Sequence, residues 1–216
     1  MSYGDTAWRV GRVWMGWPAR LATRPRLYGG DRMPREGGVV LALNHLHWID
    51  IPVVGVVSPR NINFVAKIEA HLVPGLGQVI RIHGALSVRR GESDREAVRI
   101  MRQAARDGRV LGLFVEGTRQ TSGRPGRAMP GAAMVALQED VPVVPAAIYG
   151  TQFWKLTHWT ACSVAFGEPL RFGGLPKSGK GYKEASVEIE RRIHLLFDWL
   201  ADVHARGRPS GEVPPL

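Results

Sequence analysis

The chain alternates short runs of apolar, largely β-branched residues with longer stretches in which apolar positions recur at helical spacing. The runs are apolar throughout, which is typical of strands buried on both faces of a sheet. They cover residues 38–44, 62–66, 85–88, 110–115, 142–149 and 162–166. The helical stretches cover residues 93–108, 131–139 and 183–206. Interleaved strands and helices predict a single α/β domain over residues 37–206, with a mixed, largely parallel central sheet flanked by helices.

The first 36 residues follow a different pattern, in which tryptophans and aliphatic residues are mixed with arginines and Asp5 is the only acid before Asp31. Indole rings favour the boundary between lipid head groups and acyl chains, and arginines attract anionic lipid. We therefore predict that residues 1–36 are an amphipathic, helical segment that associates with a membrane surface. The alternative is a first helix packed on the core, with its arginines extending into solvent.

Two further sequence features limit the cellular location that we predict for the protein. No stretch of 18 or more apolar residues is free of charge or histidine, so no membrane-spanning helix is predicted. Arg9 and Arg12 interrupt the only run that resembles the apolar core of a signal peptide. We expect a cytoplasmic protein, peripheral on the inner face of the cell membrane. Residues 207–216, which contain proline and glycine, are predicted to form a disordered tail.

The amino-acid composition limits the classes of function that are open to this protein. The chain has 216 residues, of which 44% are hydrophobic and 22% charged, as in globular proteins. Its net charge of +10 predicts anionic partners: nucleic acid, acidic lipid head groups, phosphorylated metabolites or an acidic carrier protein. The arginines are dispersed and no nucleic-acid motif accompanies them, so nucleic acid is not expected. Because Cys162 is the single cysteine, an intrachain disulfide and a Cys-rich metal site are excluded.

The first candidate site is Asn-His-Leu-His-Trp-Ile-Asp at residues 44–50, directly after a predicted strand. Ligands in α/β proteins bind at such strand ends. His45 and Asp50 are five positions apart, which a turn leading into a helix can bring within hydrogen-bonding distance. A carboxylate that accepts the Nδ1 proton of an imidazole leaves Nε2 as a base. With no serine nucleophile beside the pair, the substrate can supply the hydroxyl.

Two other interpretations of this segment stay open. Asp50 can be a helix-capping aspartate near a surface histidine. His45 and His47 form a His-X-His pattern at a strand end, as in metal-dependent amidohydrolases, but those barrels need more residues than this chain has. The other histidines considered as metal ligands are His71, His83 and His158. Their spacing does not match a known metal-binding pattern, so no metal is predicted.

The second candidate site is Glu-Gly-Thr-Arg at residues 116–119, again at the end of a predicted buried strand. Arg119 can grip a phosphate through two parallel hydrogen bonds. The backbone amides of Gly117 and Thr118 can donate to the same anion. Taken alone, the segment is equally an ordinary tight turn with a surface arginine.

Together, the Asn-His-x-x-x-x-Asp and Glu-Gly-Thr-Arg motifs resemble those of the glycerolipid acyltransferase family, which includes 1-acylglycerol-3-phosphate acyltransferases. Two weaker blocks follow the order of that family, at residues 84–90 and 141–145. The resemblance covers residues 39–151, roughly half of the chain. Four blocks in the family's order make chance agreement improbable.

The resemblance implies that a fatty acyl group passes directly from an acyl thioester to the hydroxyl of a lysophospholipid, foremost 1-acylglycerol 3-phosphate. The donor is acyl-CoA or acyl carrier protein, and neither a metal nor another cofactor is implied. His45 would be the general base and Asp50 its orienting partner. The implied acceptor-binding residues are Glu116, Gly117, Thr118, Arg119, Lys67 and Arg90.

The sequence departs from the family pattern at several positions. Val115 replaces a common proline, and Arg89 a common aspartate. Met129 and Pro130 stand where a Phe-Lys pair is common, and the missing lysine leaves the acceptor open. Two rival functions also remain: a lipid hydrolase that uses the same His-Asp pair to activate water, and a non-catalytic basic protein that binds anionic membranes.

Overall fold

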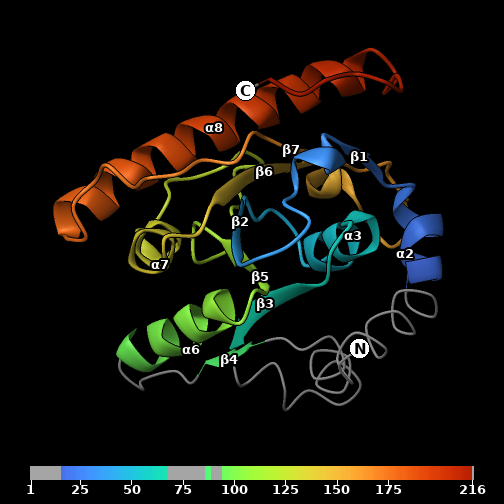
Figure 1. The fold of residues 1–216 in the computed structure, drawn as a ribbon. Helices are drawn as coiled ribbons and strands as arrows, with labels where there is room; N and C mark the ends of the chain where they lie inside the picture. The colour runs from blue at the N-terminus through green and yellow to red at the C-terminus, as the bar shows by residue number, and fades with distance from the viewer. Residues whose placement is uncertain (1–15, 68–85, 89–93, 216) are drawn as a thin grey trace.

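The computed structural model describes residues 16–67, 86–88 and 94–215 (Figure 1). These residues form a sheet with helices on both faces, in the alternating order that the sequence predicts. In chain order the elements are α2 (Gly16–Thr23), β1 (Arg26–Tyr28), η1 (Gly30–Arg32), β2 (Val39–Leu43), α3 (Asp50–Val57), β3 (Ile62–Lys67), β4 (Leu86–Val88), α6 (Asp94–Arg106), β5 (Val110–Phe114), α7 (Gly131–Glu139), β6 (Val143–Tyr149), η2 (Thr151–Phe153), β7 (Ser163–Phe166) and α8 (Gly179–Ala205).

The sheet has seven strands in the order β1-β7-β6-β2-β5-β3-β4. The five strands from β6 to β4 pair in parallel, whereas β7 runs antiparallel to β6 and β1 runs parallel to β7. The sheet is therefore mixed and largely parallel, which confirms the predicted fold class. Because the central parallel strands end at the same edge, the segments that follow β2 and β5 are brought together there.

Alternate side chains of β2 enter two different cores, since successive residues of a strand point to opposite faces. Leu41 and Leu43 pack on the α3 face, with Val53 and Val54 of that helix. On the other face, β2 packs against α6, α7 and α8 (Figure 1). Every residue of β2 is buried, which explains why its sequence is apolar throughout.

The six predicted strands are confirmed as β2 to β7, within one residue at each described end. Helix α7 has the predicted bounds, while α8 begins four residues earlier than predicted. Helix α8 is 27 residues long and buries an apolar stripe against β6. Among the described helices, none combines the length and the apolar composition needed to cross a bilayer.

The predicted boundary at residue 36 differs from the structure. Arg26–Tyr28 forms β1 and pairs with β7, so the sheet begins inside the predicted N-terminal segment. Three residues with one arginine are too short and too mixed to show a strand pattern. Of the predicted amphipathic helix, residues 16–23 form α2, and residues 1–15 lie outside the described residues.

The tail is also ordered over residues 207–215, contrary to the prediction. The Tyr28 hydroxyl donates to the Pro209 carbonyl at 3.0 Å. The Arg32 guanidinium donates to the carbonyls of Pro214 and Pro215 at 2.8 and 3.1 Å. The tail is therefore fixed by side chains from the start of the fold, and composition alone carries no signal of such contacts.

Candidate active site

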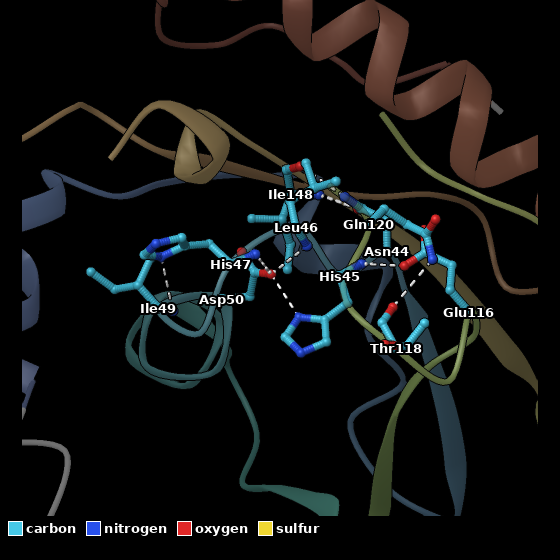
Figure 2. Close-up of polar contacts among 10 residues, drawn as sticks. All are labelled: Asn44, His45, Leu46, His47, Ile49, Asp50, Glu116, Thr118, Gln120 and Ile148. Atoms are coloured by element: carbon cyan, nitrogen blue, oxygen red, sulfur yellow. Dashed lines mark hydrogen bonds and ion pairs between the residues drawn. The ribbon is translucent and has the colours of Figure 1, made fainter. Parts of the chain in front are cut away.

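The candidate site lies at the carboxyl ends of two neighbouring parallel strands, β2 and β5. The turn over residues 44–50 follows β2, and the turn over residues 116–120 follows β5 (Figure 2). The two sequence motifs, about 70 positions apart, are thus adjacent in space. A backbone hydrogen bond of 2.8 Å from Gln120 to the His45 carbonyl joins the two turns directly.

His45 and Asp50 form a close pair. The distance between His45 Nδ1 and Asp50 Oδ2 is 2.8 Å, and Asp50 is fully buried at the first turn of α3. The same Oδ2 accepts the backbone N–H groups of Leu46 and His47, each at 2.8 Å (Figure 2). Because an ionised carboxylate oxygen can only accept, this geometry favours the tautomer with the ring proton on Nδ1, which leaves the lone pair of Nε2 free.

The His45 ring is oriented by a second contact that the sequence did not reveal. Phe114, the last residue of β5, stacks on the imidazole with the ring centroids 3.9 Å apart. Phe64 of β3 stacks in turn on Phe114 at 5.6 Å. The His45 side chain remains 16% exposed, so a substrate can reach it. The only sequence signal for Phe114 is its place two residues before the Glu-Gly-Thr-Arg motif.

Asn44 ties the end of β2 to β6. Its side-chain Nδ2 donates to the Ile148 carbonyl at 3.1 Å, and Ile148 N–H donates to Asn44 Oδ1 at 2.8 Å (Figure 2). Asn44 is fully buried. The sequence motif includes this asparagine without indicating its role, which is to hold the strand end beside His45.

Glu116 occupies a different place from the one predicted. Its Oε2 accepts the His45 backbone N–H and its Oε1 accepts the Gly126 N–H, both at 2.8 Å. The residue is 6% exposed, and burial raises the pKa of its carboxyl group. Both oxygens are engaged by the backbone inside the protein. In the structure, Glu116 therefore positions the His45 turn and the loop that carries Gly126.

The remaining residues of this motif are exposed: Gly117, Thr118 and Arg119. Gly117 has a φ of 70°, and its amide donates to the Phe114 carbonyl at 3.1 Å. That amide serves the turn and is not available to an anion, which corrects the prediction. Burial lowers the pKa of His47; the Asp50 carboxylate opposes this shift, and the positive charge of Arg119 adds to it.

Lys67 and Arg90 are the other two predicted phosphate contacts. Lys67 is the last residue of β3, the parallel neighbour of β5, and so its backbone lies at the same sheet edge as both turns. Arg90 lies outside the described residues, as do His71 and His83.

Two other groups considered in the sequence lie apart from this chemistry. Cys162 is fully buried, and its burial raises the pKa of the thiol to about 12, so the sulfur stays protonated. His158 is exposed in the segment between β6 and β7. Within the ranges that the structure describes, no three His, Cys, Asp or Glu side chains are grouped to hold a metal ion.

Comparison with known proteins relates this geometry to named relatives. The chain is 28% identical over 182 residues to a 1-acyl-sn-glycerol-3-phosphate acyltransferase of Bacillus subtilis, covering 79% of this chain and 90% of that protein. It is 36% identical over 142 residues to a lyso-ornithine lipid O-acyltransferase of Pseudomonas aeruginosa, covering 63% of this chain but only 53% of that protein.

The fold has a counterpart among solved structures. The crystal structure of the 1-acyl-sn-glycerophosphate acyltransferase PlsC from Thermotoga maritima matches with a TM-score of 0.65 and 23% identity, covering 88% of this chain and 77% of that one. A family model described as Acyltransferase matches residues 24–149, more than half of the chain. The resemblance seen in the motifs is thereby confirmed: the chain belongs to the glycerolipid acyltransferase family and is an O-acyltransferase.

Proposed function

We propose that this enzyme transfers a fatty acyl group from an acyl thioester to the hydroxyl of a lysophospholipid, foremost 1-acylglycerol 3-phosphate. The observation that carries the proposal is the His45–Asp50 pair at 2.8 Å beside the exposed Arg119 turn. A base and a cation at one sheet edge suit an acceptor that has both a hydroxyl and a phosphate. The names of the Bacillus and Pseudomonas relatives both describe acylation of a lysolipid.

In the proposed reaction, His45 Nε2 removes the proton of the acceptor hydroxyl as its oxygen attacks the thioester carbonyl carbon. A C–O bond forms and the C–S bond breaks, and the imidazolium returns its proton to the departing thiolate. Asp50 keeps the ring in the required tautomer throughout. A positioned base of this kind contributes about a hundredfold to ten-thousandfold in rate.

The acceptor phosphate is proposed to bind among Arg119, Lys67 and Arg90, with Thr118 as a further polar contact. Arg119 is exposed and the Lys67 backbone lies at the same edge of the sheet, which supports this arrangement. The donor is proposed to be acyl-CoA or acyl carrier protein, since the net charge of +10 suits the nucleotide phosphates of one and the acidic surface of the other.

We place the enzyme in the cytoplasm, peripheral on the inner face of the cell membrane. The Trp- and Arg-rich residues 1–25, which precede β1, support this location as a membrane-associating segment. Within that segment, Trp17 and Leu21 of α2 are exposed to solvent. An enzyme whose acceptor is a lipid meets that substrate where the lipid resides.

The test is to offer acyl-CoA or acyl carrier protein with a panel of lysolipids and to identify the products by mass spectrometry. We expect diacyl product, fastest with 1-acylglycerol 3-phosphate. Free fatty acid without diacyl product would favour the hydrolase, and vesicle binding without any turnover would favour the non-catalytic protein. A strong preference for an acceptor without phosphate would contradict the roles given to Lys67, Arg90 and Arg119.

We expect Glu116→Gln to lower kcat by about tenfold to a hundredfold. A glutamine has one acceptor oxygen for the two backbone N–H groups that Glu116 accepts, and its NH2 group would face the other donor. A buried donor left without an acceptor costs about 1–3 kcal/mol. Product formation and the midpoint of urea unfolding measure the two consequences.

The matched control is Glu190→Gln. Glu190 Oε2 accepts a single backbone N–H, from Ala128 at 2.8 Å, which a glutamine oxygen can still accept. Its kcat should remain within about twofold of the wild type, since a retained hydrogen bond changes little. If both variants lost activity equally, the positioning role of Glu116 would be wrong.

A further inference from the structure

The segment between β6 and β7 holds three apolar side chains in solvent. Phe153, Leu156 and Trp159 are 55%, 81% and 54% exposed. The backbone groups of Lys155 and His158 hydrogen-bond each other at 3.1 and 3.0 Å, so a tight turn presents Leu156 at its tip. A closed hairpin thus displays side chains of the kind that normally lie in a core.

Contacts of the buried Trp154 side chain hold this hairpin beside the active site. Its indole Nε1 donates to the Ala22 carbonyl of α2 at 3.0 Å. Its ring lies 5.7 Å from that of Trp48 and 5.8 Å from that of His47, both in the turn that carries His45. Helices α2 and α3 lie side by side (Figure 1). The hairpin, α2 and the His45 turn are therefore neighbours that meet at Trp154.

We call the exposed apolar surface of these neighbours the aromatic rim. It consists of exposed apolar side chains from three separate parts of the chain, which are Trp17, Leu21, Trp48, Leu156 and Trp159. A contiguous exposed apolar surface on a folded protein marks a contact with another molecule or a membrane.

In the chain segments that carry the aromatic rim, the exposed charges are all positive. Residues 16–24 and 151–160 contain no aspartate or glutamate, and Asp50, the one acid of residues 47–57, is buried. The cations there are Arg20, Arg24 and Lys155. Arg20 donates to the Val56 carbonyl and Arg24 to the Trp159 carbonyl, and no carboxylate of the described residues pairs with any of the three. Cations that pair with no described carboxylate, set among tryptophan and leucine side chains, match the chemistry of an anionic lipid interface.

We propose that the aromatic rim docks on an anionic phospholipid bilayer, with the hairpin over residues 153–159 inserted among the head groups. Trp48 then brings the His45 turn to the lipid surface. The proposal rests on the proposed function in that the acceptor is a lipid. It adds the hairpin between β6 and β7 to the N-terminal segment as a second part of the protein that contacts the membrane. Lipid docking itself involves no acyl transfer, so the two can be tested separately.

The test is co-sedimentation of the full chain with phosphatidylcholine vesicles that contain or lack phosphatidylglycerol, without substrate. The wild type should bind the anionic vesicles. The Leu156→Ser/Trp159→Ser variant should bind them about tenfold to a hundredfold more weakly, because two interfacial side chains are lost. The control is Val187→Ser/Leu195→Ser, which removes two side chains of α8 that are 60% and 43% exposed; its binding should be unchanged.

Several outcomes would overturn the proposal. Equal binding by the hairpin variant and the wild type would do so, as would a wild type that ignores anionic vesicles. A hairpin variant that becomes monomeric from a dimer would identify a second copy as the occupant of the rim. A large fall in Tm with unchanged vesicle binding would mean that other residues of the chain cover the hairpin. Leu156→Trp provides a variant independent of these, and it should bind anionic vesicles more tightly than the wild type.

Discussion

Replacement of His45 by alanine is expected to abolish acyl transfer, lowering kcat by at least about a hundredfold to ten-thousandfold. The imidazole is held at 2.8 Å from Asp50 and is the proposed acceptor of the hydroxyl proton. Without it, the acceptor must lose its proton to water. Thiol release from acyl-CoA, followed together with diacyl product, measures the loss.

The fold should survive this change, because the backbone N–H of His45 still donates to Glu116 and only a partly exposed ring is removed. The Tm of the variant should stay within a few degrees of the wild type. His194→Ala is a suitable control, since His194 is also partly buried but lies on α8, where its one polar contact with a described residue is at 3.5 Å to the Gly126 carbonyl. Wild-type turnover by the His45 variant would refute the assignment of the base.

The second large effect is expected from Asp50→Asn, which should lower kcat by about a hundredfold to ten-thousandfold, in the range seen when the carboxylate behind a catalytic histidine is made neutral. Asp50 Oδ2 accepts three N–H groups, including that of the His45 ring. An amide can retain those bonds only if its oxygen takes that position. Its NH2 group then occupies the place of Oδ1, which is buried and has no hydrogen-bond partner among the described residues.

The negative charge that favours the imidazolium during proton transfer is lost in either orientation of the amide. Steady-state kinetics should therefore show the effect in kcat more than in KM. Asp198→Asn is the matched control, because Asp198 is an exposed carboxylate paired with Arg124 on the surface, and such pairs contribute little. If Asp50→Asn turned over like the wild type while folded, the orienting role would have to be abandoned.

Much of the fold could be predicted because the central strands are buried on both faces and therefore apolar throughout. The same property prevented the prediction of α3. A short run in which every residue is apolar has no hydrophobic periodicity, so a buried helix cannot be distinguished from a buried strand. Residues 51–57 are such a run. Strand β1 was missed because its pairing with β7 is a tertiary interaction across more than 130 positions.

The candidate site was predictable to the extent that it is local in sequence. His45 and Asp50 are five positions apart, so a turn suffices to join them. Glu116 meets its partners across 71 and 10 positions, and the stacking of Phe114 on His45 depends on the pairing of β2 with β5. Neither arrangement is encoded in a local sequence pattern. Only the folded chain reveals that the Glu116 carboxylate accepts hydrogen bonds from backbone N–H groups.

The stacking of Phe114 on His45, backed by Phe64, has a consequence for the energetics of turnover. With one face covered by a phenyl ring and Nδ1 anchored, the imidazole has little torsional freedom left before any substrate arrives. The entropy of immobilising the base is thus lost during folding and not again in each catalytic cycle. An enzyme arranged in this way needs little reorganisation around its base when two bulky substrates come together.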